Sequence, residues 1–492
     1  MDTTNYILSK DENKMSKAKV LGNFVLMSVL FSINHGCVTA CIALASSDLG
    51  KDLAPWSSGT LYLMYTLCAL VGANAIVHYT GAKYGLSSAL FLYCAYIASF
   101  LVARETSGTT KWVGAILGSV IGGLAAGYLW TAQGPFMQGA SKLYAPYIKK
   151  EGEEELLPSS GGQDDRSDEI AKKKSNSLLA AIFGFTYLVC EALMKVMSTY
   201  IPTKFSGGEN TIYVVFTILS VLCAFGMLFI VDLSEVAGTT KKRDESTSLR
   251  EMLTVKTTEA IRLLFTDSKM ILLYPVQMAF GIAGSFVAYV HILHSCSRRI
   301  VVDTHTQRNT TNRYYANGVL VSHCVNDDTN YIGYFAALIA VVAGICSPIF
   351  SFVTRKFLGG KKQYVMILGI VAFLCEMTVY MTYNLKKSDL VRGEKLCDVK
   401  PLLLLYVVHG VGRGVWESTN KAVILDFFPN DAMAAFANVI VSSGLASTIG
   451  FFMYEFDKSL QDNPVVVTTI TVVLCAISLV TYPIAIRLNA KA

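Results

Sequence analysis

Long runs of apolar residues, separated by short polar segments, repeat along the whole chain. A helix needs about 20 consecutive apolar residues to cross a bilayer, so runs of this length predict membrane-spanning helices. Twelve such runs form two sets of six on either side of a charged segment at 235–268. The first set covers residues 21–46, 57–79, 86–104, 112–140, 177–200 and 211–232. The second set covers residues 269–294, 331–353, 364–384, 401–423, 432–454 and 464–486.

The composition agrees with a membrane protein. The chain has 492 residues, of which 53% are hydrophobic and 16% charged, and its mean hydropathy is +0.45. A soluble domain carries about 25% charged residues. These values exclude a soluble enzyme, a nucleic-acid-binding module and a disordered scaffold. We therefore expect an all-α polytopic protein whose main partner is the lipid bilayer.

The placement of Lys and Arg predicts the orientation, because cytoplasmic loops retain positive charge. Of 42 such residues, 25 fall on the side of both termini and 14 on the opposite side, while Lys195, Arg413 and Lys421 lie inside spans. Both termini are thus predicted to be cytoplasmic, in either the plasma membrane or an endolysosomal membrane. The predicted division is a cytoplasmic tail at 1–20, a six-helix bundle at 21–234, a cytoplasmic loop at 235–268, a second bundle at 269–487 and a tail at 488–492.

Three loops are long enough to carry features of their own. Residues 142–176 are rich in charge, Gly and Ser, which is typical of a flexible loop. Within 235–268, the spacing of the later apolar residues predicts an amphipathic helix on the membrane surface. This segment either has a regulatory role or simply connects the two halves.

The non-cytoplasmic loop 295–330 holds a glycosylation sequon at Asn309. It also holds Cys296 and Cys324, which with Cys397 are the cysteines outside the spans. We expect one disulfide among these three cysteines, with Cys296–Cys324 favoured because it closes a single loop.

Ionisable residues inside spans are candidates for function, because leaving them in lipid costs about 2.5–3.5 kcal/mol on insertion scales. The tenth span carries His409, Arg413, Glu417 and Lys421 at four-residue spacing, which places them along one stripe. One interpretation is a polar wall of a central cavity. The other is a stripe neutralised by Arg413–Glu417 and Glu417–Lys421 pairs that holds this helix against its neighbours, with Lys421 reaching the cytoplasmic interface.

Two further carboxylates lie in spans. Glu191 and Lys195 are four residues apart in the fifth span, which suits either a proton-coupling site or a static ion pair. Glu376 in the ninth span has no partner on its own helix and is expected to face a neighbouring helix or protein.

Uncharged polar and aromatic candidates complete the predicted cavity. Asn34 and His35 lie in the middle of the first span, where the imidazole either titrates or packs through hydrogen bonds. Trp130, Gln133 and Trp416 are candidates for an aromatic and amide lining, with plain packing as the alternative for Trp130. The chain has no nucleotide-binding, nucleophile or metal-ligand motif, so we expect neither an enzyme nor a bound cofactor or metal.

Several short segments carry a family resemblance. They are residues 130–134 (WTAQG), 262–275 (RLLFTDSKMILLYP), 333–334 with 346–348 (GY, CSP), 412–419 (GRGVWEST), 428–430 (FPN) and 434–438 (AAFAN). Together they resemble the uncoordinated-93 family of the major facilitator superfamily. The basic, glycine-containing segments 81–85 and 355–362 also resemble the superfamily's loop motif. Relatives often carry an acidic residue where Arg413 stands.

This resemblance implies a major facilitator fold with twelve helices in two six-helix halves. It also implies a protein that regulates a potassium channel or chaperones a receptor, which would then be its partner. The alternative is a secondary active transporter of an ion or small polar solute, with or without proton coupling. The sequence does not name the substrate, the coupling ion or the oligomeric state.

Overall fold

A computed structural model describes residues 15–50, 52–155, 164–205, 208–239, 257–293, 332–382, 399–456 and 465–490. Every regular element in these ranges is a helix. The first half contains α2 (Lys17–Leu49), α3 (Leu53–Val71), α4 (Ala73–Thr80), α5 (Ala82–Glu105), α6 (Gly108–Glu155), α7 (Asp164–Lys204) and α8 (Gly208–Met227). The short helices α9 (Leu233–Val236) and α11 (Glu259–Thr266) follow.

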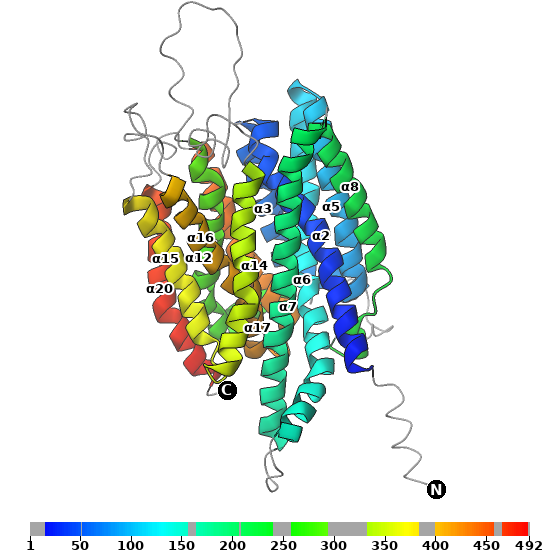
Figure 1. Cartoon of the computed structure of the whole chain (residues 1–492), viewed down its shortest axis with the longest axis vertical. Coiled ribbons are helices and arrows are strands. Elements are labelled where there is room, and N and C mark those ends of the chain that lie inside the picture. Colours follow the sequence, from blue (N-terminus) through cyan, green and yellow to red (C-terminus); the bar gives the residue numbers. More distant parts are fainter. Residues whose placement is uncertain are drawn as a thin grey trace, which may run out of the picture.

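The second half contains α12 (Ser268–Leu293), α14 (Ile332–Lys356), α15 (Gln363–Thr382) and α16 (Val399–Val415). It continues through a π-helix, η2 (Trp416–Asn420), into α17 (Lys421–Phe427), α18 (Ala432–Phe456) and α20 (Val465–Asn489). Figure 1 shows the two halves side by side, with α2 beginning and α20 ending at the same end of the bundle. We call this end the terminal end and the opposite one the far end.

The helices have the length and composition of membrane spans, which confirms a multi-pass membrane protein. Ten of the described helices pass this test, and the number becomes eleven if α3 and α4, bent by 64°, form one span. The expected count of twelve is not confirmed. The predicted tenth span is divided, because α16 ends after 17 residues where the π-helix begins.

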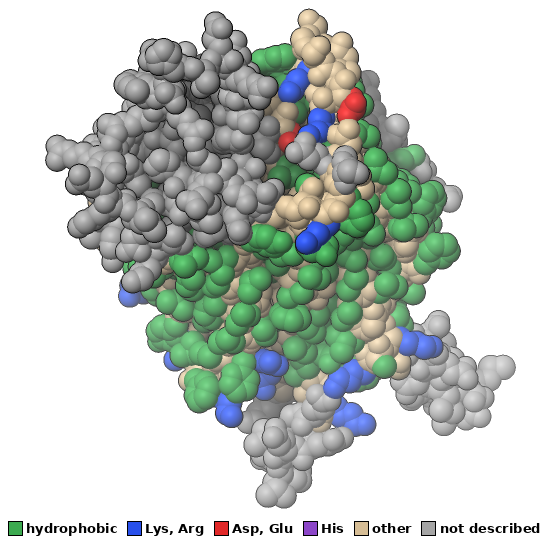
Figure 2. Space-filling model, turned by 45° about the horizontal axis from the view of Figure 1, so that its top comes forward, with side chains coloured by type: hydrophobic (Ala, Val, Ile, Leu, Met, Phe, Trp, Pro, Cys, Tyr) green, Lys and Arg blue, Asp and Glu red, His purple; other side chains and the backbone are tan. Residues whose placement is uncertain are grey.

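The outer surface matches a lipid environment. Figure 2 shows hydrophobic side chains over the middle of the visible face, with Lys and Arg side chains gathered near its lower rim. Individual side chains on lipid-facing helices are strongly exposed, as for Leu222 at 61% and Val480 at 62%. Such residues find an apolar environment only in a bilayer.

The region at 142–176 differs from the flexible loop predicted for it. Helix α6 continues to Glu155 and α7 begins at Asp164, so most of this charged region is helical. The two helices are joined by an ion pair between Lys149 and Asp168 at 2.7 Å and by a hydrogen bond from Ser141 Oγ to Asn176 Oδ1 at 2.5 Å. One pair of these charges joins α6 to α7 and another, Glu169 with Lys173, lies within α7, an arrangement that composition alone did not distinguish from a loop.

The structure describes part of the predicted amphipathic segment, but not the predicted sequon or disulfide. Helix α11 falls inside the segment predicted to be amphipathic, with Ala260 and Leu263 buried and Phe265 76% exposed. The sequon at Asn309 and the disulfide candidates Cys296 and Cys324, together with Cys397, lie outside the described residues.

Contacts between the halves create the setting for the site. Helix α7 packs against α14, while α3 and α6 both pack against α18. The π-helix η2 also contacts α7. These interfaces bring the middle of α7 and α16 together, where the sequence placed its buried charges.

Candidate functional site

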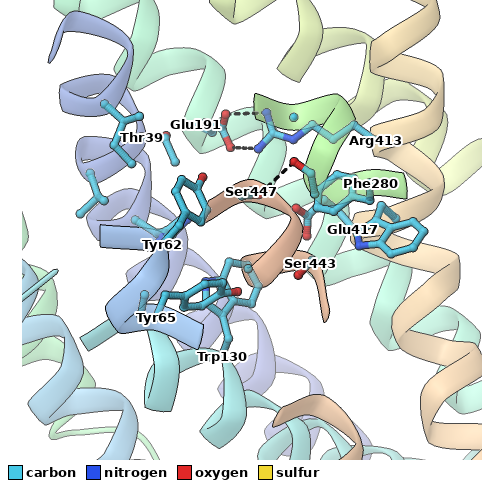
Figure 3. A pocket seen from close by; sticks show the side chains of 18 of the residues that line it. Thr39, Tyr62, Tyr65, Trp130, Glu191, Phe280, Arg413, Glu417, Ser443 and Ser447 are labelled. Atoms are coloured by element: carbon cyan, nitrogen blue, oxygen red, sulfur yellow. Dashed lines mark hydrogen bonds and ion pairs between the residues drawn. The ribbon is translucent and has the colours of Figure 1, made fainter. Parts of the chain in front are cut away.

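A cavity of about 300 Å³ lies between the two halves. Helices of both halves line it: α2, α3, α5, α6 and α7 from the first, and α12, α14, α16 to α18 from the second. On α2 the lining residues run from His35 to Ala45, and on α12 from Phe280 to Val287. Since both helices start at the terminal end, the cavity extends from the middle of the bundle toward the far end. Figure 3 shows its aromatic and charged side chains converging from opposite sides.

The strongest link across the cavity is an ion pair between the halves. Glu191 of α7 is fully buried and accepts two hydrogen bonds from Arg413 of α16, with N–O distances of 2.7 and 2.5 Å (Figure 3). The same carboxylate accepts a bond of 2.6 Å from Lys195, one turn further along α7. Arg413 also donates to the hydroxyl of Tyr187 at 3.3 Å. A two-point Arg–carboxylate contact fixes both distance and orientation, so this cluster sets the relative position of α7 and α16.

A second buried pair joins the π-helix η2 to the first residue of α17. Lys421 Nζ donates to Glu417 Oε2 at 2.6 Å, and both side chains are 9% exposed. The ammonium lies 4.6 Å from the ring centroid of Trp130 and 4.8 Å from that of Phe183. Cation–π contacts of this kind stabilise a desolvated cation. Single π-turns inside α-helices are frequently found at functional sites.

These contacts correct the expected stripe along the tenth span. The expected Arg413–Glu417 pair does not form, because Arg413 turns across the interface to Glu191. Lys421 was expected to reach the cytoplasmic interface, but it is buried against aromatic rings instead. Spacing within one helix shows which residues share a face but not which carboxylate a neighbouring helix supplies.

The carboxylate of Glu376 finds its partner on the adjacent helix. Its Oε2 lies 3.0 Å from His409 Nδ1 of α16, and the Glu376 side chain is fully buried. The other carboxylate oxygen, Oε1, has no hydrogen-bond partner among the described residues. His409 itself lines the cavity. Glu376 thus faces a neighbouring helix, one of the two surroundings predicted for it.

The first span contributes one of its two polar candidates to the cavity. His35 lines it, with its ring 5.2 Å from Trp130 and 5.5 Å from Tyr187. His35 Nδ1 has no hydrogen-bond partner in the described part of the chain. Asn34 instead donates from Nδ2 to the Ser220 carbonyl at 3.0 Å, which ties α2 to α8 away from the cavity.

Of the three remaining candidates, two line the cavity and one does not. Trp130 and Trp416 line the cavity, and Trp416 stacks on Phe280 with ring centroids 4.8 Å apart. Gln133 is fully buried but does not line the cavity, and its amide atoms lack partners among the described residues. The cavity also contains residues that the sequence analysis did not select: Tyr62, Tyr65, Tyr187, Phe280, Ser443 and Ser447. No charge or spacing distinguishes these side chains from ordinary helix residues.

Hydrogen bonds between the halves close the terminal end. Asp426 of α17 accepts from Asn176 Nδ2 of α7 at 2.8 Å and from Lys362, which precedes α15. Lys362 also donates to the backbone carbonyl of Lys173 at 3.2 Å. Gln138 of α6 donates to the Pro429 carbonyl of the second half. We call Asn176, Lys362 and Asp426 the terminal lock.

Comparison with solved structures shows that the chain has the major facilitator fold. It is similar over 94% of both chains to XylE, a proton:xylose symporter of the major facilitator superfamily bound to 6-bromo-6-deoxy-D-glucose, with a TM-score of 0.58 and 13% identity. It is also similar to the nucleoside transporter NupG, covering 95% of this chain and 99% of NupG, with a TM-score of 0.53 and 13% identity. A partially occluded, inward-open XylE from E. coli gives a TM-score of 0.52 at 14% identity over 93% of this chain and 96% of that one. No family model and no curated protein matches the sequence.

These similarities overturn the first functional expectation. The expectation of a channel regulator or receptor chaperone was wrong: XylE and NupG, which share this fold over almost the whole chain, are described as a proton:xylose symporter and a nucleoside transporter. The short motifs that suggested a regulator are compatible with the same fold. The protein is therefore a multi-pass membrane protein with the fold of solute transporters.

Proposed function

We propose that the protein is a secondary active transporter that moves a small solute by alternating access. One observation carries this proposal: a cavity lined by both halves, containing buried ion pairs and closed at one end by bonds between the halves. Ligand sites of transporters built from two related halves lie near the bilayer midplane at the interface between them. The descriptions of XylE as a proton:xylose symporter and NupG as a nucleoside transporter support the same class.

The described conformation suits the first step of such a cycle. The cavity extends toward the far end, and the terminal lock separates it from the terminal end. Release of the solute at the terminal end requires the bonds that cross between the halves to break, namely Asn176 to Asp426 and Lys362 to the Lys173 carbonyl. At the same time α7 and α16 must pivot about the Glu191–Arg413 contact, which lies beside the cavity.

We place proton coupling at Glu376 and His409 rather than at the other carboxylates. Protonation of Glu191 would leave Arg413 and Lys195 without a counter-charge, and protonation of Glu417 would leave Lys421 unpaired. Isolated buried charges are strongly unfavourable. Glu376 pairs with an imidazole side chain and not with a Lys or Arg. A proton can therefore join or leave this pair without stranding a permanent cation.

The family and the orientation of the protein in the membrane are proposed from the sequence. We propose membership of the uncoordinated-93 family, supported by segments such as 130–134 and 412–419. We also propose that the terminal end is cytoplasmic, supported by the distribution of Lys and Arg between the predicted loops. Transport as proposed needs no catalysis by the chain and no cofactor.

Flux through the purified protein tests the proposal. Proteoliposomes containing this chain alone and a trapped pH-sensitive dye receive D-xylose, uridine or benzenesulfonate, one at a time. We expect at least one solute to move protons in the wild type. In Glu376→Gln, which keeps the size of the side chain, the same solute should no longer do so. Absence of solute-dependent proton movement with every member of the panel, in vesicles shown to contain folded protein, would count against a proton-coupled transporter.

A further inference from the structure

The cavity carries more positive than negative charge. Its described lining contains two carboxylates, Glu191 and Glu417, and three permanent cations, Lys195, Arg413 and Lys421. His409 is balanced by Glu376 just behind it. The lining therefore has an excess of one positive charge at neutral pH, and each of its five charged side chains is at most 13% exposed. An uncompensated buried charge is unfavourable, so this excess favours an additional negative group.

The excess is located beside Glu191. Glu417 serves a single cation, Lys421, whereas Glu191 serves both Arg413 and Lys195. Glu191 Oε1 accepts from both of these cations, at 2.7 and 2.6 Å. An ammonium group has three donors, and the one acceptor recorded for Lys195 Nζ in the described residues is Glu191 Oε1. Lys195 therefore has capacity for a second anionic acceptor.

A further polar group without a partner lies close to this cluster. His35 is 8% exposed, lines the cavity, and has no hydrogen bond at Nδ1 in the described part of the chain. Its ring packs on Tyr187, whose hydroxyl contacts Arg413. A neutral imidazole offers one donor and one acceptor. His35 and Lys195 thus both present unused hydrogen-bonding capacity in the lining of the same cavity.

The remaining walls favour a flat, apolar body. Phe280 and Trp416 stack against each other, and Tyr62 stacks on Phe451 with centroids 5.3 Å apart. Figure 3 shows Phe280 near Arg413, with Tyr62 and Tyr65 across the cavity. Aromatic faces bind planar groups through stacking and edge contacts. A volume of about 300 Å³ lies at the lower limit for small-molecule pockets and fits a compact solute.

We propose that the transported solute is a small organic anion with one negative charge and a planar apolar body. This inference rests on the proposed function, for which it names the substrate class. The anionic group binds beside Lys195 and Arg413 within reach of His35, and the planar body lies against the aromatic walls. Binding neutralises the cavity, so an anion is preferred over a neutral molecule of the same shape.

A binding measurement that does not depend on transport tests this inference. The purified protein in nanodiscs is heated with benzenesulfonate or with the isosteric neutral benzenesulfonamide, and the melting temperature is followed. A ligand that binds only the folded state raises this temperature in a saturable manner. We expect a saturable rise of a few degrees with benzenesulfonate and a smaller or no rise with benzenesulfonamide.

Charge variants provide matched controls. Lys195→Gln makes the lining neutral and should abolish the preference for the anion, whereas Lys195→Arg keeps the charge and should retain it. The comparison of the two ligands on the wild type, together with Lys195→Arg, gives a result even if Lys195→Gln does not fold. Equal shifts by the anion and the amide, or no shift by benzenesulfonate in the wild type, would overturn the inference. If the anion is not preferred but D-xylose or uridine binds saturably, the proposed transporter function is retained and its substrate is neutral.

Discussion

Glu191 of α7 and Arg413 of α16 form a two-point ion pair across the interface between the halves, at 2.7 and 2.5 Å. The carboxylate is fully buried, and it is the shared counter-charge of two cations. The two partners are 222 positions apart in the sequence. The pair therefore links the two halves of the chain, and removing either partner has a predictable cost.

The two single substitutions should differ in their effect on stability. Glu191→Gln leaves both Arg413 and Lys195 without a counter-charge, whereas Arg413→Gln leaves Glu191 still paired with Lys195. Breaking a buried ion pair typically costs about 3–5 kcal/mol, and we expect Glu191→Gln to be the more damaging. Thermal unfolding of the purified variants measures the difference. The double variant should be less destabilised than the sum of the two singles; additive effects would show that the pair is not coupled.

Weakening the terminal lock should expose the terminal side of the interface. Asp426→Asn removes the charge that holds Lys362 and weakens the link to Asn176. Thr419, buried in the π-helix near this lock, offers a reporter position. We expect Thr419→Cys to react faster with a membrane-impermeant maleimide when combined with Asp426→Asn.

The exposed carboxylate Glu235 provides the matched control for this measurement. Glu235→Gln removes one negative charge from the same end of the bundle without touching the lock. Its labelling rate should equal that of the Thr419→Cys background. Equal labelling in the Asp426→Asn variant as well would mean that the lock does not restrain this end.

The substitution Glu376→Gln should abolish the coupling of transport to the proton gradient without preventing movement of the solute. The amide keeps a hydrogen bond to His409 but cannot take up a proton at neutral pH. We expect exchange of solute between the two sides to persist, while accumulation driven by a pH gradient is lost. Measurement of both fluxes in the same proteoliposome preparation checks this. Accumulation at the wild-type level would assign coupling to another group.

Close packing of α3 against α6 gives a prediction on stability alone. A Cβ atom at Gly123 would come into hard contact with the Leu61 carbonyl oxygen. Gly123→Val should therefore destabilise the protein by at least about 1–3 kcal/mol. Gly22 of α2 has open space around the same position, so Gly22→Ala should be neutral or stabilising. Melting temperatures of the two variants, measured side by side, decide whether this helix contact is as tight as described.

The sequence predicted the helical architecture well because its main determinant is local. A run of about 20 apolar residues identifies a membrane helix regardless of its neighbours. This local signal failed at two places. The charged region around Lys149 and Asp168 is helical, with these two residues paired across two helices. The tenth span contains a π-turn at Trp416–Asn420 that hydropathy does not reveal.

The candidate site was predictable only as a set of residue types. Glu191, Arg413, Glu417 and His35 were selected because ionisable groups are rare in spans, and all four line the cavity. Their pairing was not predictable, since the contact between Glu191 and Arg413 depends on how two distant helices pack. Aromatic residues such as Tyr62 escaped selection because a membrane protein contains many aromatic side chains with no role in binding.

Reversible closure of the terminal lock tests the central claim most directly. Asn176 and Asp426 are in hydrogen-bond contact, so the combination Asn176→Cys with Asp426→Cys places two thiols within reach of a short, reducible bis-methanethiosulfonate cross-linker across the two halves. Exchange of labelled benzenesulfonate, D-xylose and uridine is measured in proteoliposomes before and after reduction, with Asn176→Cys alone as control. Alternating access predicts exchange of at least one solute that stops when the lock is cross-linked and returns on reduction. Exchange that continues through the cross-linked protein, or no exchange of any solute in the wild type, would contradict the account.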